Sequence, residues 1–160
     1  MATLVQLIEK GVLRPVHIKL RRNEFRDRFF LGLPGFRTWL ENEVKTATAF
    51  YEGDIQPKRQ ALAILKDFIV GKPFPGPKLY KKMSPHTDDV WELRTPDLRF
   101  FGWFYRKNCY IATSGELFEK LKADERLYEE HRINCIKARN GMDLDPPKYL
   151  QGATADDVID

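Results

Sequence analysis

The apolar positions in the first half of the chain change from an alternating to a helical spacing. Residues 16–20 (VHIKL) place an apolar side chain at every second position, which predicts a strand. From Phe36 the apolar residues fall at positions 36, 39, 40, 44 and 47, the spacing of one helical face. A second helical stripe covers residues 57–70, where Pro57 suits the first turn and Gly71 the end. This half therefore predicts one strand followed by two helices.

The second half begins with three apolar segments that are joined by short polar links. Residues 89–94 (DVWELR), 99–106 (RFFGWFYR) and 109–114 (CYIATS) each predict a strand. The first link has Pro96 at the second position of a type I turn, and the second link is only two residues long. Links this short imply an antiparallel meander. Residues 116–140 then follow a helical pattern.

The predicted order is strand, helix, helix, three strands and a last helix. This order is typical of an α+β domain with an antiparallel sheet of about four strands, two helices packed on one face and a C-terminal helix. We place this domain at residues 16–140, after an N-terminal extension at residues 1–15. Residues 141–160 lack periodicity and contain two adjacent prolines, so we expect an acidic, flexible tail.

Charge is distributed unevenly between this domain and the tail. The 160 residues carry a net charge of +4, and the tail, with five Asp and one Lys, carries −4 of its own. The first 140 residues therefore carry +8, which suits an anionic partner such as nucleic acid or an acidic protein. An ordinary soluble basic domain has the same signature.

Composition and sequence motifs indicate the compartment in which the protein is located. No apolar run reaches the roughly 18 residues of a membrane span, and the first residues lack the pattern of a signal peptide. Two cysteines are too few for a disulfide framework or a cysteine-rich zinc site, so we expect reduced, buried thiols. The sequence contains no Gly-rich phosphate loop and no metal-ligand motif. These features favour a cytoplasmic protein.

Two arginines flank the turn between the first two strands of the meander. Strand alternation places Arg99 on the same face as three aromatic residues, and Arg94 ends the neighbouring strand. Across a tight hairpin the two guanidinium groups would lie close together and repel unless an anion lies between them. One interpretation is that this edge of the sheet holds a phosphate backbone. The other is that each arginine pairs with Glu92, Asp97 or solvent.

Four segments of the chain follow a known pattern: VWELR (90–94), LRFFGWFY (98–105), CYIATSGELFEKLK (109–122) and INCIKARN (133–140). In this pattern the chain resembles the RelE/ParE superfamily of bacterial toxins, and most closely its HigB-like, phage-derived branch. The resemblance covers residues 57–140, and residues 16–56 agree only in the order of strand and helices. It implies a RelE-like fold and the toxin of a type II toxin–antitoxin pair.

The resemblance also implies an activity and its partners. Such toxins are mRNA interferases, endoribonucleases that act on translating ribosomes, in which a ribose 2′-OH attacks the adjacent phosphate. The reaction needs a base near the 2′-OH, an acid near the leaving 5′-oxygen and cations around the phosphate. It needs no metal and no other cofactor. The implied partners are a cognate antitoxin protein, mRNA and the ribosome, with no membrane.

The same resemblance implies roles for several basic residues. Arg99 occupies the place of the arginine that contacts the scissile phosphate, and Arg94 is expected to bind RNA beside it. Lys120 matches the first lysine of the family's F-x-K-K turn. Lys122 follows one residue late, and one residue rotates a helical side chain by about 100°. Lys122 is therefore an RNA-binding candidate whose direction differs from the family pattern.

The C-terminal helix supplies the candidate acid and base. Tyr128 and His131 lie three residues apart, hence on one helical face, and Arg132 adjoins them as an RNA-binding candidate. With suitable pKa values the pair would transfer the two protons, although a core tyrosine and a solvated histidine fit the same spacing. Lys81 and Lys82 are expected to bind RNA from the segment before the meander.

Two other functions use the same fold. ParE-like members inhibit DNA gyrase as binding proteins and do not cut RNA, and the displaced Lys122 agrees with this alternative. A RelE-fold protein can also have lost its nuclease activity and act as a binding module, to which the segments outside the domain would contribute. Arg99 together with Lys120 favours the nuclease.

Overall fold

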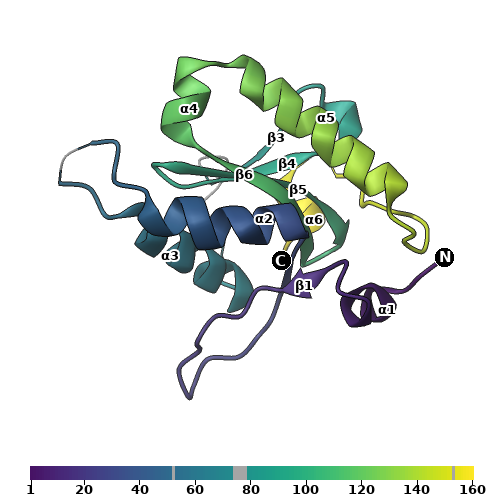
Figure 1. Ribbon diagram of the computed structural model, residues 1–160. Helices are drawn as coiled ribbons and strands as arrows, with labels where there is room; N and C mark the ends of the chain where they lie inside the picture. The colour runs from purple at the N-terminus through teal and green to yellow at the C-terminus, as the bar shows by residue number, and fades with distance from the viewer. Residues whose placement is uncertain (52, 74–78, 153) are drawn as a thin grey trace.

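A mixed sheet of six strands forms the centre of the computed structural model, which describes residues 1–51, 53–73, 79–152 and 154–160. The strands lie in the order β1-β2-β6-β5-β4-β3 (Figure 1). β2 runs parallel to β6, and the other neighbouring pairs are antiparallel. The strands are β1 (Arg14–Pro15), β2 (Phe29–Gly32), β3 (Tyr80–Lys82), β4 (Trp91–Arg94), β5 (Leu98–Arg106) and β6 (Cys109–Leu117).

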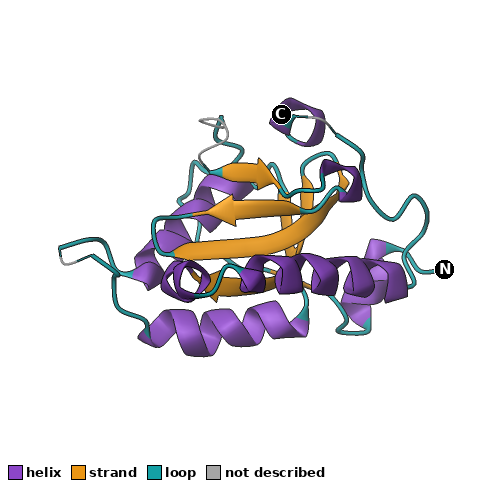
Figure 2. Ribbon diagram, turned by 90° about the horizontal axis from the view of Figure 1, so that it is seen from above, coloured by secondary structure: helices purple, strands orange, loops and turns teal. Residues whose placement is uncertain are grey.

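Helices pack along both faces of this sheet (Figure 2). One face carries α2 (Pro34–Trp39), the η1 segment that continues it (Leu40–Val44), and α3 (Pro57–Ile69). The opposite face carries α4 (Phe118–Ala123) and α5 (Arg126–Gly141). Shorter elements are α1 (Leu4–Glu9), η2 (His86–Asp88) and α6 (Ala155–Val158). In the part of the chain that the structure describes, no helix has the length and apolar character needed to cross a bilayer.

The α+β class is confirmed, but the sheet is larger than expected and is mixed rather than antiparallel. Its parallel strand is β2, whereas the predicted strand at residues 16–20 is part of the loop before β2. A parallel strand beside β6 must be buried on both faces. Phe30, Leu31 and Gly32 meet this requirement, and the alternating polar residues of 16–20 do not.

The central strand β5 is buried on both faces and separates two apolar clusters. Phe100 and Phe104 pack with residues of α2 and α3 on one face. Phe101 and Trp103 pack with residues of α5 on the other. Each face of β5 is therefore covered, and side chains on the second face lie between the sheet and the C-terminal helices.

The predicted helix boundaries agree closely with the structure in α3. Pro57 occupies its first turn, and Gly71 follows its end with a φ of 77°, a left-handed value that favours glycine. The helical pattern at residues 116–140 begins later than predicted, because β6 continues to Leu117. Asp124 then separates α4 from α5.

Both ends of the chain pack on the sheet and belong to its core. Leu144 and Val158 are fully buried, and the backbone N–H of Leu150 donates to the carbonyl of Phe104. Ala2 forms a parallel bridge with Leu144, which ties the two ends together. This arrangement differs from the expected N-terminal extension and flexible tail, because scattered apolar residues in both segments complete the two clusters without any periodicity.

Candidate active site

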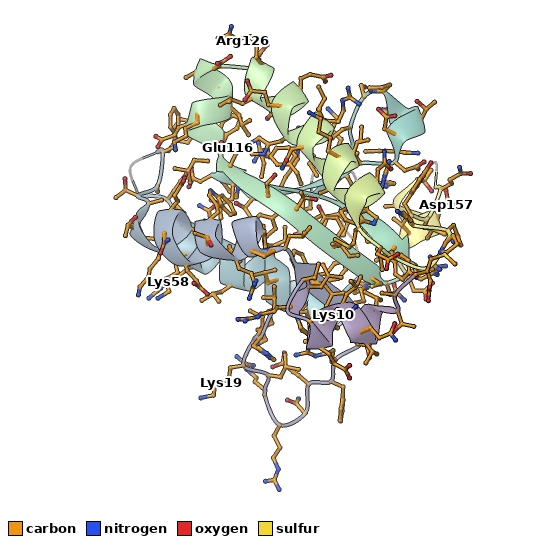
Figure 3. The ribbon with its side chains drawn as sticks, turned by 45° about the vertical axis from the view of Figure 1, so that its right-hand side comes forward. Lys10, Lys19, Lys58, Glu116, Arg126 and Asp157 are labelled. Carbon is orange, nitrogen blue, oxygen red and sulfur yellow. The ribbon has the colours of Figure 1, made fainter. Side chains whose placement is uncertain are left out.

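A β-bulge in β6 determines which of its side chains face α5. Phe101 of β5 pairs with Ser114, whereas the next residue, Gly102, pairs with Ala112, so Thr113 is an extra residue in β6. Such a bulge shifts the alternation of the strand by one residue. Beyond it Ser114 and Glu116 share the face of Phe101. Figure 3 shows Glu116 where β6 approaches α4.

His131 of α5 binds to both of these polar residues. Its Nδ1 lies 2.7 Å from the Ser114 hydroxyl oxygen, and its Nε2 lies 3.1 Å from Glu116 Oε2. The imidazole stacks on the ring of Phe101, with 4.5 Å between centroids and 11° between planes. The His131 and Glu116 side chains are each 15% exposed. The imidazole is therefore held at both nitrogens and on one ring face, while a small part of the pair reaches solvent.

The charge state of Glu116 follows from its neighbours. Burial acts to raise the pKa of this carboxyl, but the hydrogen bond from His131, the Leu117 backbone N–H and the charges of His131 and Lys120 outweigh it. The pKa of Glu116 is consequently lower than its ordinary value, so the group is a carboxylate at neutral pH. A carboxylate can only accept, so Nε2 of His131 carries the proton of their hydrogen bond.

Lys120 lies next to this pair. Its Nζ is 3.3 Å from Glu43 Oε2 and 4.0 Å from Glu116 Oε1, and its side chain is about half exposed. The short helix α4 directs it towards the end of β6. The site thus contains a carboxylate, a histidine and a solvent-accessible cation.

Arg99 lies on the same face of the sheet but is largely occupied by its own hairpin. Its Nη1 donates to the backbone carbonyls of Thr95 and Leu98, and its guanidinium carbon lies 4.6 Å from the centroid of Phe118. The residue is only 8% exposed, and burial is the main cause that lowers its pKa, which the charge of Tyr128 partly offsets. Its buried Nε lacks a hydrogen-bond partner among the described residues.

A buried carboxylate reduces the repulsion between the two facing arginines, although the charge of Arg94 still acts to lower the pKa of Arg99. Arg94 pairs with Arg99 in the β4–β5 register, and the Nε of Arg94 forms an ion pair with Glu92 Oε1. Glu92 is 2% exposed and on the same face, so an internal carboxylate balances Arg94. Asp97 instead accepts hydrogen bonds from Gln60 and from the Phe50 backbone. No external anion is required to hold the hairpin.

Of the remaining predicted residues, only Tyr128 lies close to the histidine. Its ring meets Phe101 edge-on at 6.2 Å, on the same helical face as His131. Arg132 pairs with Glu129 and with Asp88 of η2, and so faces away from Glu116. The structure therefore gathers three predicted residues around Glu116 and Ser114, namely Lys120, Tyr128 and His131, with Arg99 beneath Phe118.

The other three predicted lysines, Lys122, Lys81 and Lys82, lie elsewhere. The Nζ of Lys122 lies 5.3 Å from the centroid of the Phe50 ring, so the side chains of Lys122 and Lys120 point in different directions. Lys81 and Lys82 are on β3 at the far edge of the sheet, where Lys82 Nζ pairs with Asp89 Oδ1 at 2.7 Å. β4 and β5 separate this edge from β6.

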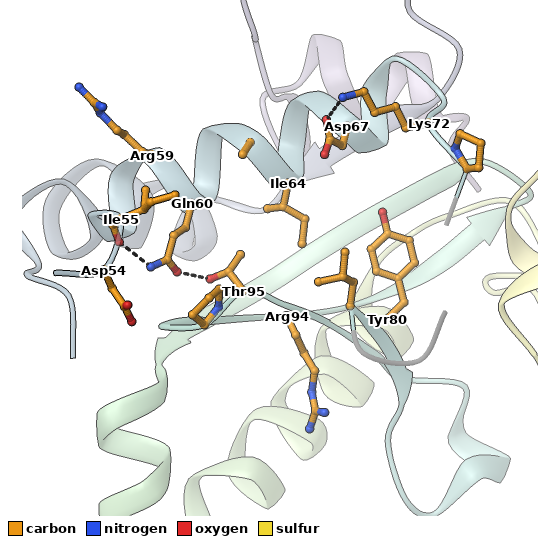
Figure 4. A pocket seen from close by; sticks show the side chains of 14 residues that line it. Asp54, Ile55, Arg59, Gln60, Ile64, Asp67, Lys72, Tyr80, Arg94 and Thr95 are labelled. Carbon is orange, nitrogen blue, oxygen red and sulfur yellow. Dashed lines mark hydrogen bonds and ion pairs between the residues drawn. The ribbon is translucent and has the colours of Figure 1, made fainter. Parts of the chain in front are cut away.

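A separate cavity of about 460 Å³ lies on the opposite side, between α3 and the strands β3 and β4 (Figure 4). Gln60 and Thr95 line it, and Gln60 Oε1 accepts a hydrogen bond from the Thr95 hydroxyl at 2.7 Å. Arg94 belongs to the lining as well, but its guanidinium points away from Gln60 and Ile64 (Figure 4). The cavity and the His131–Glu116 pair therefore belong to different faces of the sheet.

No family model, no curated protein and no solved structure matches the chain. Within the described ranges, no group of three or more His, Cys, Asp or Glu side chains is placed to hold a metal ion.

Proposed function

We propose that the protein is a metal-independent endoribonuclease, the toxin of a type II toxin–antitoxin pair that cuts mRNA on the ribosome in the cytoplasm. The observation that carries the proposal is the hydrogen-bonded pair of Glu116 and His131, with Lys120 beside it. A carboxylate and a histidine supply the two proton transfers that RNA cleavage by its own 2′-OH requires. The resemblance of the sequence to RelE-like toxins also supports the proposal.

In the proposed reaction Glu116 accepts the proton of the ribose 2′-OH. The 2′-oxygen forms a bond to phosphorus as the bond to the 5′-oxygen breaks, and protonated His131 gives its proton to that leaving oxygen. The products are a 2′,3′-cyclic phosphate and a 5′-OH end. Lys120 stabilises the charge on the phosphate, to which Arg99 contributes from beneath Phe118. Glu116 then loses its proton to solvent and His131 regains one from solvent, which restores the starting state; both side chains are 15% exposed.

Cleavage of mRNA by the purified protein in the presence of translating ribosomes tests this proposal. Glu116→Gln and His131→Gln should each lower the rate by about 10² to 10⁴, the usual contribution of one acid or base. His17→Gln is the matched control, because His17 is an exposed histidine in the loop before β2. Equal cleavage by the wild type and both site variants would reject the assignment and point to a contaminating nuclease.

The cellular role requires a separate experiment. Expression of the wild-type chain in a bacterium should arrest growth and create new mRNA 5′ ends inside coding regions, and Glu116→Gln should abolish both effects. Co-expression of an antitoxin encoded beside the gene should restore growth. New 5′ ends that do not depend on translation would contradict action on the ribosome.

A second candidate function is favoured by the position of Arg99. Its guanidinium donates to two backbone carbonyls and is covered by Phe118, so it is poorly exposed to a phosphate. A ParE-like inhibitor of DNA gyrase, or a binding module of RelE-like fold, does not need this group. Growth arrest without mRNA cleavage, together with loss of gyrase supercoiling activity, would support this function instead of the nuclease.

A further inference from the structure

Two exposed aromatic side chains lie beside the candidate active site, in the segment between η1 and α3. Phe50 and Tyr51 are 39% and 55% exposed, and their rings meet edge-on at 4.8 Å. Exposed aromatic pairs of this kind are unusual on a surface unless they contact a partner. We call Phe50 and Tyr51 the aromatic platform.

The platform is held in place although it is exposed. The backbone N–H of Phe50 donates to Asp97 Oδ1 at 3.1 Å, and Asp97 is itself buried at the turn of the β4–β5 hairpin. The Phe50 ring contacts Phe118 at 6.4 Å between centroids. An aromatic group that is already ordered loses little entropy on binding, which favours its use in recognition.

The same contacts connect the platform to the candidate active site. Phe118 lies between Phe50 and the guanidinium of Arg99, and α4 carries both Phe118 and Lys120. Lys122, from the same helix, places its Nζ 5.3 Å from the centre of the Phe50 ring. Figure 1 shows the segment between η1 and α3 extending from the helical layer on the side where α4 lies. A chain of contacts therefore runs from Lys122 through Phe50 and Phe118 to Arg99, and Lys120 lies on the same helix.

We propose that the aromatic platform stacks an unpaired base of a single-stranded RNA, next to the phosphate that Lys120 binds. Aromatic faces with interleaved cations suit single-stranded nucleic acid, whose bases are free to stack while its phosphates meet the cations. A duplex keeps its bases stacked internally and cannot use the platform. The proposal rests on the RNA site proposed above. In it, Lys122 contacts the RNA phosphate backbone beside the stacked base.

Binding of a single-stranded RNA with methylated 2′-oxygens tests the platform, because this RNA cannot be cleaved by its own 2′-OH. Tyr51→Ala should weaken binding roughly 5- to 150-fold, the usual effect of losing one stacked base. Phe50→Leu, which keeps an apolar contact with Phe118, should weaken it less. Phe25→Ala is the matched control, since Phe25 is 73% exposed in a basic loop at another part of the surface, and should change affinity less than twofold.

Salt dependence and a fluorescent base separate stacking from charge. The ratio of wild-type to Tyr51→Ala affinity should stay constant between 50 and about 200 mM salt, whereas Lys122→Gln should reduce the salt slope by about 0.7. A 2-aminopurine at one position of the RNA should be quenched by the wild type and not by Tyr51→Ala. Affinity for a duplex of the same sequence should be the same for both proteins.

Each of the other possible results contradicts the platform, the nuclease or both. Unchanged single-strand affinity in Tyr51→Ala, with Glu116-dependent cleavage intact, refutes the platform and leaves the nuclease. A wild type that binds no RNA at low salt refutes both proposals and indicates a protein partner for the platform. Platform-dependent binding without any cleavage supports the platform and refutes the nuclease.

Discussion

Replacing Asp97 with alanine should destabilise the fold strongly, because this buried carboxylate accepts two hydrogen bonds. Asp97 is 4% exposed. Its Oδ2 accepts from Gln60 Nε2 at 2.6 Å, and its Oδ1 accepts from the Phe50 backbone at 3.1 Å. These bonds join the start of α3, the β4–β5 turn and the segment that carries the aromatic platform.

The expected magnitude follows from the donors that alanine would leave unpaired. A buried donor without a partner costs about 1–3 kcal/mol, and Gln60 Nε2 would be left with one unpaired N–H. The partly exposed Phe50 backbone N–H can bind water instead, so we expect a loss of about 1–3 kcal/mol. The whole free energy of unfolding of a domain is only about 5–15 kcal/mol. Asp97→Asn retains one acceptor oxygen of the same size and position, so it should cost roughly half as much as Asp97→Ala.

Urea unfolding followed by tryptophan fluorescence measures these differences. The midpoint should fall in the order wild type, Asp97→Asn, Asp97→Ala with a constant slope. A double-mutant cycle with Gln60→Ala should give a coupling energy of about 0.5–3 kcal/mol, since the two side chains bond directly. A loss below about 0.5 kcal/mol in Asp97→Ala, the range of surface substitutions, would refute the role assigned to this network.

Three further predictions concern acid stability, the thiols and the C-terminal segment. The folded-state pKa of Glu116 lies below the ordinary 4.5, so the ionised carboxylate stabilises the fold above that pH. This stabilisation is lost as the pH falls through the folded-state pKa. Glu116→Gln should therefore flatten the acid side of a curve of unfolding free energy against pH. Burial raises the pKa of Cys109 to about 12 and of Cys135 to about 11, so a disulfide reagent at pH 8 should modify either thiol only in urea. Leu144→Ala should cost about 2–5 kcal/mol in thermal unfolding, and a negligible cost would mean that this segment does not pack on the sheet in solution.

Strong periodicity made the centre of the fold predictable. The stripe of α3 and the two apolar faces of β5 each require burial on a particular side, so element type and order follow from them. β2 was missed because four residues are too few to show a period, while the alternation at residues 16–20 belongs to a loop. Leu144 and Val158 were missed because single apolar residues in an aperiodic segment carry no signal before the sheet is assembled.

The candidate site was predictable only where it did not depend on the bulge. His131 and Tyr128 lie on one face of α5 because of their helical spacing. Arg99 lies on the face of β5 that packs against α5, as its position in the strand predicts. Ser114 and Glu116 were missed because Thr113 shifts the alternation of β6 by one residue. That shift arises from the pairing of β6 with β5, which local sequence does not specify.

Arg99 and Glu116 therefore differ in what their substitution can reveal. Arg99→Ala removes a donor from two backbone carbonyls of the hairpin and opens the space beneath Phe118, so it would impair folding whether or not Arg99 contacts a phosphate. Glu116→Gln keeps the size of the side chain and an oxygen that accepts from His131, but it removes the carboxylate that would take the 2′-OH proton. Lost RNA cleavage in Glu116→Gln, in a protein that is still fully folded at the assay temperature, would assign the base. Lost cleavage in Arg99→Ala alone would be equally expected of a damaged hairpin.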